Sequence, residues 1–174
     1  MRASSPMDFQ LRQLLTSSIG FASPLLAIGT APAGFNTTNA IGYMIEGTKP
    51  VPVAALVSQL PVAEPTLQPY FSNSQAFYTQ PANTTVYYLL VVNAAGALRV
   101  IQGTFAGQLF FGSWGALKGT GDVPNLDSLL WATYGLIKVV TGAATTYTPG
   151  VTAYNAALVT TTFINCAVAP ATNP

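Results

Sequence analysis

The chain has 174 residues, of which 50% are apolar and only 6% are charged, against about 25% charged residues in ordinary globular domains. Its net charge is +1 and it contains no histidine, which excludes histidine-based catalytic triads, histidine metal ligands and a strongly basic surface for nucleic acid. Cys166 is the only cysteine, so an intrachain disulfide and a cysteine zinc site are excluded as well. We therefore expect no cofactor and no metal, and a surface that is neutral or covered by other chains.

Residues 1–35 predict an N-terminal arm that carries one short helix. Residues 8–17 fit that helix, because Asp8 can cap its N-terminus while Phe9, Leu14 and Leu15 group loosely on one side. The rest of the arm is rich in turn-forming residues. We expect these three apolar side chains to contact a neighbouring subunit.

Three long stretches of the sequence carry no charge, namely residues 13–45, 65–98 and 139–174. Each is interrupted by proline, glycine, asparagine or threonine, and none offers about 20 consecutive apolar residues. We therefore expect no membrane-spanning segment and no membrane partner.

Residues 36–174 predict a β domain, because runs of β-branched and aromatic residues alternate with glycine- and proline-containing turns. The strongest run, residues 85–92, is apolar on both alternating faces, so both faces should be covered. The other expected strands lie at residues 41–46 and 51–57, which would form a hairpin, and at 97–102, 134–141 and 158–167. This pattern predicts a mainly β fold, either an antiparallel β-sandwich or a β-barrel.

Residues 103–121 are rich in glycine and aromatic residues and have little propensity for helix or strand. The stretch carries a large apolar surface on Phe105, Phe110, Phe111 and Trp114. It either folds as a loop over the core of its own domain or forms an interface with another chain. The sequence leaves both alternatives open, and the four aromatic residues are candidate interface residues.

Few residues offer catalytic chemistry. Asp122 and Asp127 are the only close pair of acids, and the proline and asparagine between them favour turn-forming aspartates over a catalytic or cation-binding pair. Ser113 does not fit the GxSxG pattern of a nucleophile turn, and no histidine is present to act as its base. We therefore expect no catalytic residue and no enzymatic activity.

Aromatic residues make up 11% of the chain, and exposed tyrosines could form a platform for sugars. The local aromatic cluster comprises Tyr70, Phe71, Phe77, Tyr78, Tyr87 and Tyr88. Sugar sites also need well-placed polar and charged groups, and charges are scarce here. The core or a subunit interface is therefore the favoured location for these rings.

Several runs, in a fixed order, resemble one class of protein. They are residues 41–47 (IGYMIEG), 80–90 (QPANTTVYYLL), 93–96 (NAAG), 135–142 (GLIKVVTG), 147–152 (YTPGVT) and 159–163 (VTTTF). This order of strands and turns, over about residues 35–165, resembles the small β-rich virion structural proteins of tailed bacteriophages, of the head-decoration and head-fibre types. The resemblance implies an oligomeric structural protein, often bound to a capsid lattice, without catalytic residues.

On this basis we expect a capsid decoration or cement protein on the surface of a virion. It would form a homotrimer and bind the lattice of a major capsid protein, which it would stabilise by bridging subunits. A second interpretation places the chain in the tail, neck or fibre base of the virion. A third, of another class, is a module that binds carbohydrate or a host surface. None of the three involves nucleic acid or a membrane.

Overall fold

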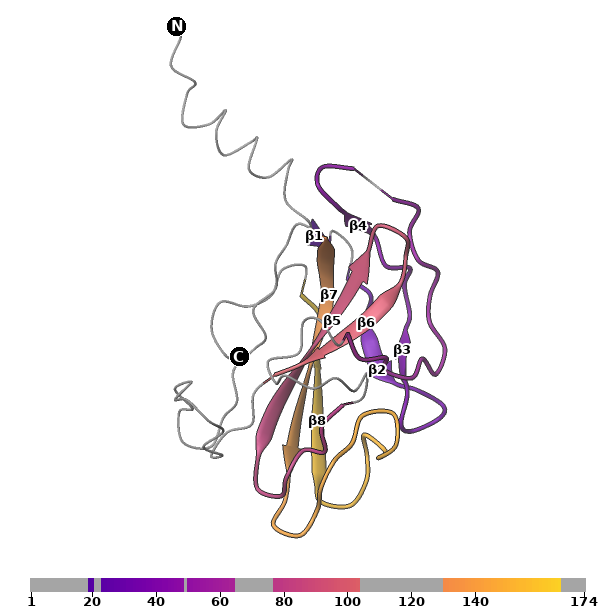
Figure 1. Ribbon diagram of the computed structural model, residues 1–174. Coiled ribbons are helices and arrows are strands. Elements are labelled where there is room, and N and C mark those ends of the chain that lie inside the picture. Colours follow the sequence, from indigo (N-terminus) through magenta and orange to yellow (C-terminus); the bar gives the residue numbers. More distant parts are fainter. Residues whose placement is uncertain (1–18, 21–22, 49, 65–76, 104–129, 167–174) are drawn as a thin grey trace, which may run out of the picture.

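The computed structural model describes residues 19–20, 23–48, 50–64, 77–103 and 130–166 (Figure 1). Within these ranges the protein is mainly β and has no helix. The expected helix over residues 8–17 and all but the first residue of the stretch 103–121 lie outside them. So do the candidate interface residues Phe9, Leu14, Leu15, Phe105, Phe110, Phe111 and Trp114.

The described ranges contain eight strands. They are β1 (Ile19–Gly20), β2 (Leu26–Ile28), β3 (Phe35–Thr37), β4 (Tyr43–Met44), β5 (Thr85–Asn93), β6 (Leu98–Gln102), β7 (Trp131–Thr141) and β8 (Val159–Ile164). Four strands form one antiparallel sheet in the order β6-β5-β7-β8, while β1 pairs with β4 and β2 with β3 in two small antiparallel sheets. The last four predicted strands are confirmed as β5 to β8.

The predicted hairpin near residue 46 is present in a short form. Glu46 and Gly47 both have positive φ, 46° and 75°, as a two-residue turn between antiparallel strands requires. The flanking Ile45 and Thr48 exchange two main-chain hydrogen bonds, of 2.9 and 2.8 Å. The expected strand at residues 51–57 is wrong beyond a single bridge, because the prolines within and before it cannot donate to a ladder.

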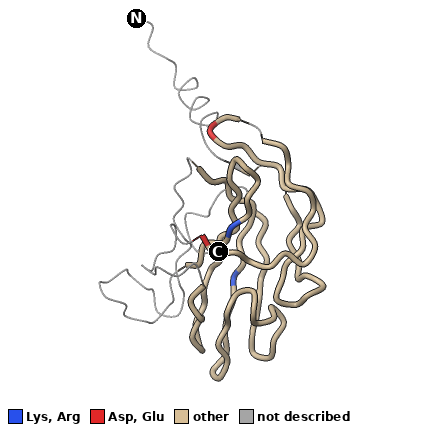
Figure 2. The backbone as a smooth tube through the Cα atoms, turned by 45° about the vertical axis from the view of Figure 1, so that its right-hand side comes forward, with Lys and Arg blue, Asp and Glu red and all other residues tan. Residues whose placement is uncertain are grey.

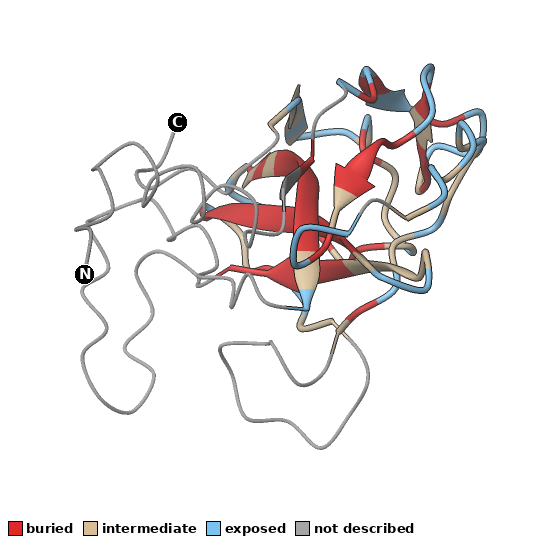
Figure 3. Ribbon diagram, turned by 90° about the horizontal axis from the view of Figure 1, so that it is seen from above, coloured by how far each residue is buried: buried red, intermediate tan, exposed pale blue. Residues whose placement is uncertain are grey.

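Strand β5 is buried on both faces, as its sequence predicts. One set of alternating side chains packs into the larger core cluster with β7 and β2, and the other set packs into a smaller cluster on the opposite side of the sheet. The first set is Val86, Tyr88, Leu90 and Val92, and the second is Tyr87, Leu89 and Val91. Figure 3 shows the resulting band of buried strands.

A β-bulge interrupts the pairing of β5 with β7. Leu90 pairs with Gly135, but Val91 pairs with Thr133, so Tyr134 is the extra residue on β7. A bulge of this kind places two consecutive side chains of one strand against one position of its partner and increases the local twist.

The bulge reverses the alternation of side chains along β7. On one side of it, Ile137 and Val139 face the larger cluster while Leu136 faces the smaller one. On the other side, the even-numbered Ala132 and Tyr134 face the larger cluster. The bulge therefore keeps apolar side chains of β7 on the larger cluster along its full length.

The larger cluster is closed by the first part of the chain. Leu26 of β2, Phe35 of β3 and Tyr43 of β4 pack onto the sheet together with Ile41 and Ile45. In Figure 1 these segments lie along one side of the four-stranded sheet. Strands β1 and β2 precede the expected boundary between the arm and the domain, and that boundary falls at the start of β3.

The smaller cluster lies on the opposite face of the sheet. It contains Ile101 of β6 and Leu136 of β7 with the second set of β5 side chains, and Trp131, Ile164 and Cys166 pack against it. Lys138 lies on this face because it pairs with Tyr87, and its Nζ lies 5.4 Å from the centre of the Tyr87 ring. The lysine thus sits in an inner strand, with its charge beside an aromatic face that attracts cations.

We predict that Gly135→Ala lowers the free energy of unfolding by roughly 1–3 kcal/mol, the usual cost of overpacking a core. A Cβ at Gly135 would overlap the side chain of Leu26, which fills the space left by the glycine. Urea denaturation of the single and double variants measures the effect. Leu26→Ala should cost less in the Gly135→Ala background than in the wild type, and strictly additive losses would contradict this packing.

Candidate interaction surface

The β2–β3 hairpin is bordered by a second segment of chain, residues 50–64. Main-chain hydrogen bonds join Phe35 to Gln59 in both directions, at 3.0 and 2.8 Å, and the Thr37 amide donates to the Leu56 carbonyl at 3.1 Å. Residues 56–59 of the segment 50–64 therefore follow β3 along its free edge. The hairpin and this segment together form the outer layer of the domain.

Side chains fix the position of this segment at Ser58. The Ser58 amide donates to Asn36 Oδ1 at 2.6 Å, and the Ala31 amide donates to Ser58 Oγ at 3.0 Å. Gly34 permits the close approach, since a Cβ there would lie 2.8 Å from the Ser58 carbonyl oxygen. The layer is thus built from polar contacts between backbones and short side chains.

The outer layer exposes many apolar side chains. Val51 is 85% exposed and Val57 is 78% exposed. Both side chains are therefore available for contact with another protein. The exposed large apolar residues of the layer are Leu25, Ile28, Val51, Val57, Leu60 and Val62. We call these six residues the outer apolar surface.

The outer apolar surface is free of charge. No charged residue occurs in residues 23–45 or 50–63. The charged residues of the described ranges lie elsewhere, at the β4 turn, in the inner strand β7, and in the ion pair of Glu64 with Arg99 at 3.6 Å (Figure 2). The centres of protein interfaces are depleted in charged residues, so exposed apolar side chains in uncharged segments are candidates for contact with another chain.

Two members of the predicted aromatic cluster are core residues. Tyr87 and Tyr88 are 1% and 2% exposed and point to opposite faces of β5. Phe77 and Tyr78 are half-buried against the larger cluster. The other two, Tyr70 and Phe71, lie outside the described ranges. Tyr87 and Tyr88 therefore cannot stack against a sugar in this fold.

Tyr88 belongs to a buried polar network at one end of the sheet. Its hydroxyl donates to Gln80 Oε1 at 3.0 Å and accepts from Gln102 Nε2 at 3.4 Å. Gln80 Nε2 in turn donates to the carbonyls of Thr84 and Val139, each at 3.0 Å. The network ties the start of β5 to its neighbours and to the preceding turn.

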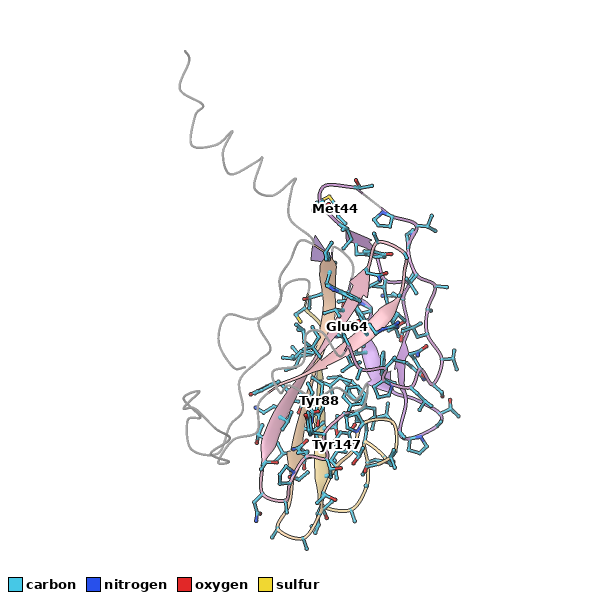
Figure 4. All side chains as sticks on the ribbon, in the orientation of Figure 1. Met44, Glu64, Tyr88 and Tyr147 are labelled. Carbon is cyan, nitrogen blue, oxygen red and sulfur yellow. The ribbon has the colours of Figure 1, made fainter. Side chains whose placement is uncertain are left out.

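Five buried tyrosines belong to the larger cluster: Tyr43, Tyr88, Tyr134, Tyr147 and Tyr154. The rings of Tyr88 and Tyr147 are 5.8 Å apart (Figure 4), as are those of Tyr147 and Tyr154. Burial raises the pKa of Tyr88, Tyr134 and Tyr147 above the ordinary value, and it raises the pKa of Tyr154 to about 12. The phenols therefore stay protonated in the folded protein at neutral pH.

The other candidate groups for chemistry contribute no site in the described ranges. Asp122, Asp127 and Ser113 lie outside them. Among the residues that the structure describes, no three histidine, cysteine, aspartate or glutamate side chains gather as metal ligands. Burial raises the pKa of the Cys166 thiol to about 11, which makes it a poor nucleophile at neutral pH.

No family model, curated protein or solved structure matches the chain. In the described parts of the chain, no helix has the length and apolar character needed to cross a membrane.

Sequence reasoning did not find the outer apolar surface. Its residues belong to two segments, 25–28 and 51–62, which look like unremarkable turn-rich and proline-rich connections when taken singly. The available signal was the shared absence of charge in residues 13–45 and 50–63. Only the pairing of β3 with the second segment brings the two segments into one layer.

We predict opposite effects for two tyrosine-to-phenylalanine substitutions in the core. Tyr88→Phe should cost about 1–3 kcal/mol, because it removes the hydroxyl that donates to the buried Oε1 of Gln80. Tyr134→Phe should be neutral or stabilising, because the Tyr134 hydroxyl is buried with no hydrogen-bond partner among the described residues. Thermal unfolding of both variants measures the difference, and an equal loss for the two would contradict the network.

Alkaline pH should unfold the protein cooperatively. Below pH 10 the phenols of Tyr88, Tyr134, Tyr147 and Tyr154 are neutral in the folded and in the unfolded state, so their ionisation has no effect on stability. Above pH 10 the unfolded chain loses phenol protons that the folded chain retains, so each of the four costs about 1.4 kcal/mol per pH unit, until its folded pKa is reached. Tyrosinate absorbance and circular dichroism should change together, and ionisation of all tyrosines near pH 10 with an intact fold would contradict the burial.

Proposed function

We propose that the protein is a structural component of a virus particle, specifically a decoration or cement protein that binds the assembled capsid lattice of a tailed bacteriophage. The outer apolar surface is the observation that carries this proposal. It presents exposed valine, leucine and isoleucine without charge, and such a surface is costly in water unless another protein covers it. The resemblance of the sequence to phage head-decoration and head-fibre proteins supports the same interpretation.

The proposed architecture is an antiparallel β-sandwich, in which the outer layer and the four-stranded sheet enclose the larger cluster, with an N-terminal arm that carries a short helix. We propose that the protein forms a homotrimer on the capsid surface and acts without a cofactor, a nucleic acid or a membrane. Stabilisation then follows from mass action, because a protein that binds only the assembled lattice shifts the equilibrium towards it.

The carbohydrate-binding alternative receives less support. It depended on exposed aromatic rings, and Tyr87 and Tyr88 of that cluster are buried. The tail, neck or fibre-base alternative involves the same kind of apolar contact, so only the position on the particle separates it from a capsid decoration protein.

The proposal is tested with charges placed on the outer apolar surface. Val51→Lys with Val57→Lys should abolish binding to capsids that lack the protein, measured by co-sedimentation, while circular dichroism stays unchanged because both sites are exposed. Val151→Lys is the matched control, since Val151 is 78% exposed and does not belong to the outer apolar surface. Capsid binding that survives the double substitution, or label on tails in immuno-electron microscopy of virions, would overturn the assignment.

A further inference from the structure

The two edges of the four-stranded sheet differ. At one edge, the segment 62–64 runs beside β6: the Val100 amide donates to the Val62 carbonyl at 2.8 Å, and the Glu64 amide donates to the Val100 carbonyl at 3.2 Å. At the other edge lies β8, which pairs with β7 on its inner side. The segment 62–64 thus covers the outer side of β6.

The main-chain groups that face outwards from β8 follow from its pairing. The Gly142 amide donates to the Leu158 carbonyl at 2.8 Å, so even-numbered residues of the strand face β7 and odd-numbered residues face away. The Val159 amide is used by the Ala156 carbonyl, at 3.0 Å. Within the described ranges, the outward amides and carbonyls of Thr161 and Phe163 have no hydrogen-bond partner.

The composition of β8 suits pairing with another strand. All its residues are β-branched or aromatic (VTTTFI), and it has no charge, proline or glycine. Natural sheets usually protect an edge with a lysine, a proline, a bulge or a covering segment, and β8 has none of the first three in its sequence. Thr160 and Thr162 are exposed on one face, so a second strand could also make contacts between threonine side chains.

We propose that β8 is a homotypic docking edge, which pairs antiparallel with β8 of a second copy about a twofold axis at Thr162. In this register the Thr161 amide and carbonyl meet the carbonyl and amide of Phe163 of the second copy. The twofold axis repeats these contacts, so the four outward main-chain groups of Thr161 and Phe163 are paired in each strand. An antiparallel pair of identical edges closes on itself, whereas a parallel pair would leave an open repeat.

Electrostatics permits this contact. Among the described residues, the charge nearest to Thr162 is that of Lys138, its pairing partner on β7. The two copies of Lys138 would stand three strand spacings apart, about 14 Å, which exceeds the Debye length of about 8 Å at physiological ionic strength. Their repulsion is therefore screened.

The size of the contact sets its strength. A six-residue strand on each side buries much less than the roughly 1,600 Å² of a standard stable interface. Pairing should thus be weak in dilute solution and strong where copies are held close together, as on a lattice. The inference does not depend on the proposed function, because it is argued from the pairing and sequence of β8. A twofold contact also differs from the proposed trimer, and on a lattice it would link neighbouring trimers.

Disulfide trapping tests the register. In a Cys166→Ser background, Thr162→Cys places two thiols at a non-hydrogen-bonded pair with Cα atoms about 4.5 Å apart, which a disulfide can span. Thr160→Cys is the matched control, equally exposed but with its Cα atoms about 13 Å apart in this register. Mild oxidation should give at least ~10-fold more dimer, at twice 18.1 kDa, for Thr162→Cys than for Thr160→Cys.

A proline variant separates edge pairing from random collision. Thr161→Pro removes an outward amide without touching the hydrogen bonds to β7, a position where sheets tolerate proline, and it should abolish the Thr162→Cys dimer. In the wild type, hydrogen exchange of the Thr161 and Phe163 amides should slow as protein concentration rises. Equal cross-linking at both cysteine positions, or amides already protected at high dilution, would overturn the proposal, the latter because another segment of the same chain would then cover the edge.

Discussion

The pairing of β5 with β7 is the contact on which the rest of the described structure depends. Both strands lie inside the sheet, and both carry apolar side chains on their two faces. A regular ladder would send Ala132 and Tyr134 to the face opposite Ile137, because side chains alternate strictly along a strand. The bulge at Tyr134 cancels that alternation, and Gly135 beside it leaves the space that Leu26 fills. The first part of the chain thus packs onto the sheet, through Leu26, beside the bulge in the β5–β7 pairing.

Both faces of this sheet carry few charged side chains. A strand with two buried faces tolerates few charges, and Lys138 on β7 places its ammonium over the Tyr87 ring, which attracts cations. The polar requirements of the interior are met instead by neutral groups, as in the contacts of Gln80 and Gln102 with Tyr88. Neutral pairs avoid the desolvation cost of buried ions. Residues 23–45 and 50–63, which form most of the outer layer, likewise carry no charge.

The sequence predicts the sheet well and the outer layer poorly, for physical reasons. Strand β5 and the turn after it are recognisable because the signals are local: β-branched residues, then Asn93 and Gly96 in a tight turn with Gly96 at φ 78°. The bulge at Tyr134 leaves no local signal, since it depends on the register between strands that are distant in sequence. The run 51–57 reads as a strand by composition, but Pro52 removes a donor and only Val53 forms a bridge. The outer apolar surface exists only after Phe35 pairs with Gln59.

The outer apolar surface and the edge of β8 offer two unlike means of assembly. The first gains free energy from removing valine and leucine from water, which is strong but not directional. The second gains little from area, and instead fixes orientation through directional main-chain hydrogen bonds. A protein that covers a lattice needs both properties, since apolar contact alone permits sliding and edge pairing alone is weak. The uncharged stretches 23–45 and 50–63 and the uncharged strand β8 suit both, because no like charges hold a partner away from the valine side chains or the strand edge.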